Sequence, residues 1–245
     1  MISPQAFLKL PIDFNGICTI YPPSVNDVIT NPFDDYFSIL TLSQDTIEEE
    51  FTPLMATQPD LIMPTPFEYL LVVCAQSDDF YKKAKEAFKF FLKEDVTFLW
   101  EAATILVGDL KEEIQVAKDT SSLRLLTDKN FLAFQDAIRG SCGKAPYKPL
   151  EDLSDLPARA REMKLKARER DRVKAKQDAK KAPSLETCLV SICCMGVGLT
   201  PLNIGEISYA SVGEIIETNQ RHEKYSSDCW SIMLGADPKK IKLEY

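Results

Sequence analysis

Hydrophobic residues recur through the chain at the spacing of amphipathic helices, and one stretch shows this most clearly. Between residues 80 and 94, aromatic and alanine side chains return every three or four positions, so they share one face of a helix. We expect Asp78 or Asp79 to cap this helix at its N-terminus. The stripe consists of Phe80, Ala84, Ala87, Phe88 and Phe91.

Other helices in the first half of the chain are marked by residues that favour helix starts. Ser24 is placed to cap a short helix over residues 25–30, and Pro32 to begin another over residues 32–42. Thr65 precedes an apolar run, and Glu68 follows three positions later, which is the pattern of a capping box. These segments predict a mainly helical N-terminal part.

One more helix is predicted after Thr127, which is a favourable capping residue. Phe131, Phe134 and Ile138 follow at helical spacing and are expected to form its buried face. Gly140 is expected to end the helix, because glycine readily adopts the left-handed conformation found there.

A smaller set of segments favours strands. Asn15 and Gly16 form a turn dipeptide between two short runs, and the second run is rich in β-branched residues, so residues 6–23 predict a hairpin. Residues 96–100 and 103–109 are also β-favouring. The expected fold class is therefore α+β and mainly α-helical, with a small β-hairpin in the N-terminal domain.

Residues 159–181 differ from everything around them. They hold eleven Lys or Arg against four acids, about +7 at neutral pH, in a chain of net charge −8. Met163, Leu165 and Val173 form no continuous apolar stripe, so this segment cannot lie against a core along its length. It predicts an exposed, helical or flexible charged linker, about 35 Å long if helical throughout.

The last part of the chain predicts two helices joined by a loop. Ser184 is placed to cap the first helix and Gly196 to end it, while Ser211 and Glu214 form a capping-box pattern for a long helix that ends at Gly235. Because so small a unit would be marginally stable alone, we expect it to pack against the N-terminal domain, another subunit or a partner. The expected layout is an N-terminal α+β domain over 1–150, a linker over 151–183 and a helical C-terminal domain over 184–245.

Composition argues against several classes of enzyme. The seven cysteines have no regular spacing, the single histidine is His222, and no glycine-rich phosphate-binding motif is present. No nucleophile with a matching base can be assembled, so we predict no catalytic residue, no cofactor and no metal site. No apolar run approaches the roughly 20 residues of a membrane span, and no secretory signal is evident at the start, so we expect a cytoplasmic protein.

A nucleic-acid-binding or regulatory function is one alternative, since the basic segment could contact phosphates and residues 198–221 superficially resemble a helix-turn-helix. However, the helix that would enter the DNA groove carries Glu214 and Glu217 near its start. Their negative charges would be repelled by the phosphates. Binding to other proteins fits the composition better.

Several residues are candidates for such contacts with a protein partner. Tyr81 and Phe90 lie off the apolar stripe of their helix, and the others fall in the C-terminal part. For each of them, packing within the protein's own core is the alternative. The C-terminal candidates are Leu202, Asn203, Ile204, Gly205, Glu206, Tyr209 and Trp230.

The order of short segments resembles one known family. The chain contains "ICTIYPPSVNDV", "PFEYLL", "KEAFKFFLKEDV" and "NFLAFQDAIRG", then the basic linker, then "LTPLNIGEISYASVGEII" and "LGADPKKIKLEY". In this order and layout, they resemble the tail assembly chaperones of tailed bacteriophages. The likeness extends over most of the chain but includes no catalytic motif.

The resemblance implies a non-enzymatic role in tail morphogenesis. Such chaperones bind the tape measure protein, keep it soluble and recruit tail tube protein, without remaining in the virion. By this likeness residues 1–150 would bind the tape measure protein and residues 184–245 the tube protein, in the host cytoplasm, with many copies coating one client. A structural protein of the phage particle is a further alternative.

Overall fold

The computed structural model describes residues 3–48, 51, 62–108, 123–148, 157–181 and 183–234. The protein is mainly helical and has two small antiparallel sheets, so the expected mainly helical α+β class is confirmed. The helices are α1 (Pro4–Phe7), α2 (Val25–Thr30), α3 (Phe33–Leu40), α5 (Pro66–Gln76), α6 (Asp78–Leu92), α8 (Asp128–Ser141), α9 (Ala158–Lys181), α10 (Leu185–Cys194) and α11 (Tyr209–Met233), with short 3₁₀ turns η1 (Trp100–Ala102) and η3 (Ile204–Glu206).

The predicted hairpin is present near the N-terminus. Strands β1 (Ile12–Phe14) and β2 (Cys18–Ile20) pair antiparallel around the Asn15-Gly16 turn. Both turn residues have positive φ, 53° and 69°, which is the conformation that makes this dipeptide favourable in tight hairpins.

A three-stranded sheet forms from β3 (Val96–Leu99), β4 (Thr104–Val107) and β5 (Leu125–Leu126). β4 is central, pairing antiparallel with β3 on one side and with β5 on the other. The two longer strands were predicted from their composition. The two-residue β5 was not, because so short an apolar pair has no periodicity of its own.

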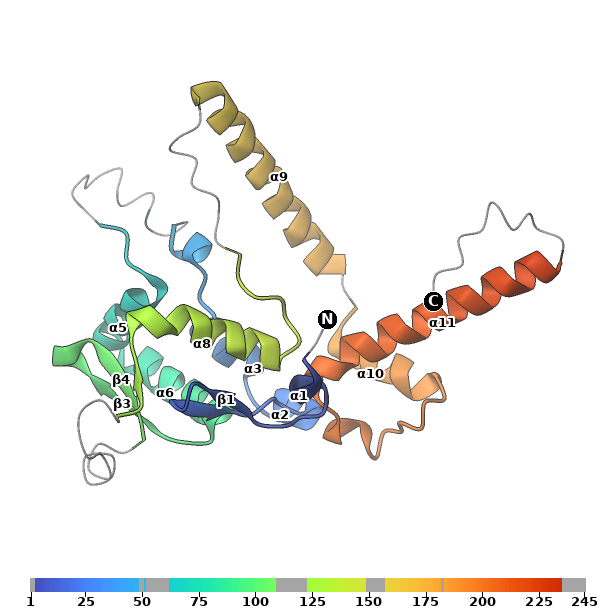
Figure 1. The fold of residues 1–245 in the computed structure, drawn as a ribbon, viewed down its shortest axis with the longest axis horizontal. Coiled ribbons are helices and arrows are strands. Elements are labelled where there is room, and N and C mark those ends of the chain that lie inside the picture. Colours follow the sequence, from blue (N-terminus) through green and yellow to red (C-terminus); the bar gives the residue numbers. More distant parts are fainter. Residues whose placement is uncertain are drawn as a thin grey trace.

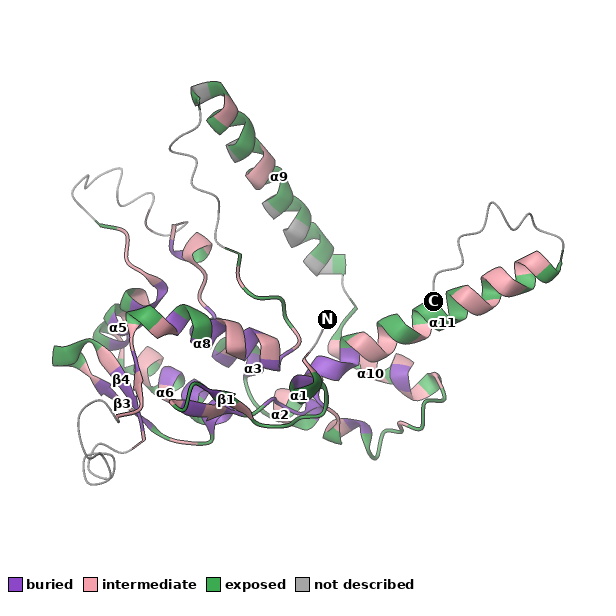
Figure 2. Ribbon diagram, viewed as in Figure 1, coloured by how far each residue is buried: buried purple, intermediate pink, exposed green. Residues whose placement is uncertain are grey.

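An aromatic core holds the N-terminal part together. Helices α3, α5, α6 and α8 contribute to it, and Figure 2 shows their buried residues in purple. Rings from different helices contact one another. The ring centres of Phe67 and Phe131 are 5.0 Å apart, and those of Phe88 and Phe134 are 5.8 Å apart. Burial of such large side chains is the main source of stability here. The most buried rings are Phe67, Phe88, Phe91, Phe131 and Phe134.

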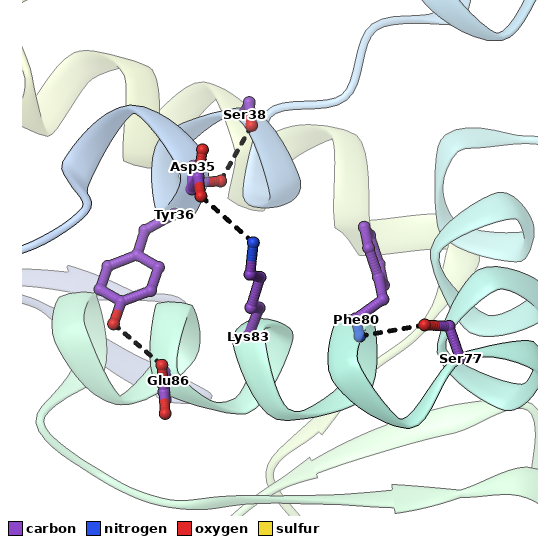
Figure 3. A network of polar contacts seen from close by, with 7 residues as sticks. All are labelled: Asp35, Tyr36, Ser38, Ser77, Phe80, Lys83 and Glu86. Carbon is purple, nitrogen blue, oxygen red and sulfur yellow. Dashed lines mark hydrogen bonds and ion pairs between the residues drawn. The ribbon is translucent and has the colours of Figure 1, made fainter.

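Polar contacts fix the packing of α3 against α6 (Figure 3). The Tyr36 hydroxyl on α3 donates a hydrogen bond to Glu86 on α6, at 3.0 Å. One turn away, the Lys83 ammonium lies 3.4 Å from the Asp35 carboxylate. Because both members of the ion pair are largely exposed, that pair contributes little energy, and the burial of the neighbouring rings dominates.

Besides α3, which begins at Phe33 with Pro32 as its N-cap, three helix boundaries differ from the sequence-based expectation. The N-cap of α6 is Ser77, whose hydroxyl accepts from the Phe80 N–H, so neither Asp78 nor Asp79 caps the helix. The helix α8 runs past Gly140 to Ser141, and the residue with positive φ is Gly143.

The third difference is at the start of α11. This helix begins at Tyr209 after Ser208, two residues before the Ser211 cap that the capping-box pattern suggested. The Ser211 hydroxyl instead donates to the Ser208 carbonyl oxygen at 2.7 Å. The expected end at Gly235 lies outside the described residues. The predicted capping residues Ser24, Thr65, Thr127 and Ser184 are confirmed as N-caps of α2, α5, α8 and α10.

Two long helices extend away from the core (Figure 1). α9 coincides with the basic segment, and Figure 2 shows its described residues exposed or half-buried along its whole length. α11 packs against α1 and α10 near its N-terminal end and then continues outward. Both helices therefore present long surfaces to solvent or to a partner.

Candidate functional site

The C-terminal helices rest on the N-terminal part through a small backbone junction. Ser24 and Ser208 form an antiparallel bridge. Beside it, the Val25 N–H donates to the Ile207 oxygen at 3.0 Å, and the Tyr209 N–H donates to the Pro23 oxygen at 2.9 Å. Three residues at the start of α2 are thus joined to the segment that leads into α11.

A second hydrophobic cluster lies beside this junction. Val25 from α2 packs with Ile192 from α10, Ile204 from η3 and Val212 from α11. All four are buried, so the C-terminal helices share their core with the N-terminal part. At the same place Gly143 approaches α11 so closely that an added Cβ would lie 3.1 Å from the Cα of Ala210.

Two of the partner-binding candidates belong to the aromatic core. Phe90 is 9% exposed and its ring contacts those of Phe33, Tyr36 and Phe91. Tyr81 is half-buried and packs against Phe98 and Trp100 at the three-stranded sheet. In this structure Phe90 presents almost no surface to a partner, whereas Tyr81 is partly accessible.

The loop candidates divide into exposed and structural residues. Leu202 is 97% exposed, whereas Ile204 is buried in the second cluster. The Asn203 side chain accepts from the Thr200 N–H at 2.7 Å and donates to the Gly198 oxygen, so it stabilises the loop. Its neighbours Gly205 and Glu206 contact the N-terminal part through Asn26 and Lys9 respectively.

The two aromatic candidates on α11 lie in different environments. Tyr209 packs edge-on against Phe33, at 5.0 Å between ring centres, and burial raises the pKa of its hydroxyl. Tyr209 therefore belongs to the contact between the N-terminal part and the C-terminal helices. Trp230 lies on the outer part of α11 and is 63% exposed, followed by Met233 at 74% and Leu234 at 84%.

A groove runs along the inner half of α11, with a volume of about 880 Å³. We call it the α11 groove. Phe7 of α1, which is 42% exposed, and the loop after α10 line it together with α11. Its lining combines apolar and polar side chains: Phe7, Val197, Leu199 and Ile215, with Glu214, Thr218, Asn219, Arg221 and His222.

This groove was not predicted, and only one part of it had a local sequence signal. Ile215 falls on the apolar face of a predicted helix, but Phe7 and Val197 lie in short, irregular segments. They come together only because the junction brings α1 beside α11.

The cysteine thiols and the acidic side chains are candidates for reactive or metal-binding arrangements. All seven cysteines are free thiols, and burial raises the pKa of Cys18, Cys74 and Cys142 to about 12, so these three stay protonated and unreactive. Within the described residues, no cluster of three His, Cys, Asp or Glu side chains is arranged to hold a metal ion. Nor is any helix there long and apolar enough to cross a membrane.

Comparison with known proteins gave no match: no protein family, curated protein or solved structure is similar to this chain. The candidate site therefore rests on the geometry of the chain itself. Its distinctive parts are the α11 groove, the exposed outer half of α11 and the basic helix α9.

Proposed function

We propose that this protein is a non-enzymatic assembly chaperone of a phage tail, which binds the tape measure protein, keeps it soluble and recruits tail tube subunits. The segment order and the central basic linker are the basis of the resemblance from which the proposal starts. Residues 1–150 would bind the tape measure protein and residues 184–245 the tube protein.

The observation that carries the proposal is the apolar surface that the C-terminal part leaves open. Large apolar side chains of α11 and its neighbouring loop are more than half exposed, which is typical of surfaces that bind other proteins. The α11 groove adds a concave surface of the kind that accepts an amphipathic helix. The most exposed of these side chains are Leu202, Trp230, Met233 and Leu234.

The basic helix α9 supports a division of labour between the two parts. It has no apolar stripe, and the Lys166–Glu162 ion pair at 2.6 Å is of the i,i+4 type that stabilises isolated helices. As a semi-rigid spacer it would let one part bind a long client while the other recruits subunits. Many copies on one client would need only modest affinity each, because multivalency supplies the rest.

The test is co-purification of the client. The affinity-tagged chain is produced together with the product of the longest reading frame immediately downstream, and the complex is isolated and its stoichiometry measured. We expect several copies of this chain on each client molecule. If the client is absent from the purified fraction at every salt concentration tested, the proposed function is wrong.

A further inference from the structure

One face of α11 continues from the groove to the outer end of the helix. Groove-lining residues of this helix are centred on Ile215, Thr218 and His222. Spacings of three and four residues carry the same face onward to Tyr225, Cys229 and Ile232. We call these six positions the α11 stripe, and they have the heptad spacing by which two helices pack side by side.

The two halves of this stripe are in complementary situations. The inner half borders the α11 groove, which no described side chain fills and whose lining includes Phe7, Val197, Leu199 and Ile215. On the outer half, Tyr225, Cys229 and Ile232 are half-buried, and the neighbouring Trp230 and Met233 are exposed. No described residue of α11 after Ile216 belongs to either hydrophobic cluster, so this helix has a groove at one end and exposed apolar side chains at the other.

We propose that α11 pairs antiparallel with α11 of a second copy of this chain, forming a two-fold symmetric dimer. The outer end of each helix would lie in the α11 groove of the other copy. A two-fold axis near residues 223 and 224 places Ile215 opposite Ile232 of the second copy, and His222 opposite Tyr225. In a symmetric pairing of this kind, one two-fold rotation covers the outer half of each stripe and fills both grooves.

The charges beside the stripe fit this register. Arg221 and Asp228 flank it on the same side, one heptad apart, so in an antiparallel pair Arg221 faces Asp228 of the second copy, twice in the dimer. Within one copy Arg221 lies 3.6 Å from Glu214, but both side chains are substantially exposed, so little energy opposes a change of partner.

Length also favours a second copy over an unrelated helix. The stripe from Ile215 to Ile232 extends over about 26 Å, so the outer end of one helix reaches the groove of the other without any change in either chain. The outer end itself supplies the apolar side chains that the groove requires. The pairing would occupy the α11 groove, so a second copy and a partner's helix would compete for it.

The first test measures molar mass against concentration for the full chain, by light scattering or sedimentation. We expect a dimer in the micromolar range. Ile232→Asp should raise the apparent dissociation constant at least tenfold, since it puts a charge opposite Ile215. Ser227→Asp, on the opposite face of the same helix turn, serves as the matched control and should leave the dimer intact. A circular dichroism spectrum checks that both variants fold.

The second test fixes the register. Arg221→Asp should weaken the dimer, and the double variant Arg221→Asp with Asp228→Arg should restore it. Thr218→Cys should form a disulfide with Cys229 of the second copy under mild oxidation, whereas Gln220→Cys, on another face, should not. A chain that stays monomeric at 100 micromolar, or a dimer that Ile232→Asp leaves unchanged, would overturn the proposal. If the groove instead binds a helix of another protein, this chain alone would remain monomeric.

Discussion

At the scale of single residues, Asp27 is the clearest link between local capping and the join of the two parts. Its carboxylate accepts hydrogen bonds from the Ser24 N–H at 2.9 Å and the Ser24 hydroxyl at 2.7 Å, while Ser24 itself bridges to Ser208. Burial alone would raise the pKa of this carboxyl, but the hydrogen bonds outweigh it, so the pKa is lowered. The charged form is therefore the one that stabilises the folded protein.

The pH dependence of stability follows from this lowered pKa. The contribution of Asp27 is fully present above its unfolded pKa of about 3.9 and is lost as the pH falls through the lower pKa of the folded state. Asp27→Ala should reduce the free energy of unfolding by about 1 kcal/mol at pH 7. Urea unfolding between pH 7 and about pH 2 should show a difference that is constant down to about pH 4 and shrinks below it. An exposed control, Glu101→Ala, should show no such trend; a difference for Asp27→Ala that stays constant over the whole pH range would contradict the assignment.

Arg139 is a second residue whose role is set by burial. Its guanidinium donates to the Thr41 oxygen at 2.6 Å, lies 3.8 Å from the Asp136 carboxylate and covers the Tyr147 ring at 5.2 Å. It thereby ties the end of α8 to the end of α3 and to the segment that follows α8. No sequence pattern predicted the contacts with Thr41 and Tyr147, because both residues lie outside α8; only the Asp136 contact is local, at i,i+3 within the helix.

Replacement of Arg139 by leucine should destabilise the fold by about 1–3 kcal/mol, because the buried Thr41 oxygen would lose its donor. Lys144→Leu is the matched control, since Lys144 is exposed and lies nearby in the chain. Equilibrium unfolding in urea measures both. Equal stability of the two variants would show that the Arg139 contact contributes nothing.

At the scale of elements, local signals predicted most of the fold. The Thr65–Glu68 capping box and the Asn15-Gly16 turn are both complete within a few residues, so the sequence contains all of their geometry. The start of α11 was misplaced because Ser211 and Glu214 also match a capping box, while the chain actually enters the helix from Ser208, which is held at the junction. Tertiary contacts overrode the local pattern there.

Helix α9 makes an element-scale prediction, because none of its described residues belongs to a hydrophobic cluster. Ala167→Pro should break this helix at a local cost of about 3 kcal/mol while leaving the melting temperature of the protein unchanged. Ala133→Pro, at an exposed alanine within α8, should lower the melting temperature strongly, since α8 carries core residues. Thermal unfolding followed by circular dichroism distinguishes them. A large drop for Ala167→Pro would mean that α9 packs against the body.

At the scale of the whole molecule, the structure combines a well-packed aromatic body with open surfaces on the C-terminal helices. The α11 groove unites Phe7 with Val197, which are separated by most of the chain, so no local pattern could have predicted it. Among the sequence-based candidates, Leu202 and Trp230 are exposed, whereas Phe90 and Ile204 are core residues. Side-chain type alone could not separate them, because large apolar residues serve in cores and in interfaces alike.

The most direct measurement of the proposed chaperone role is the solubility of the client. The product of the longest reading frame immediately downstream is produced alone and with this chain, and its soluble fraction is quantified. Our account predicts that the client is largely insoluble alone and becomes mostly soluble with the full chain. A soluble fraction that is the same with and without this protein would contradict it.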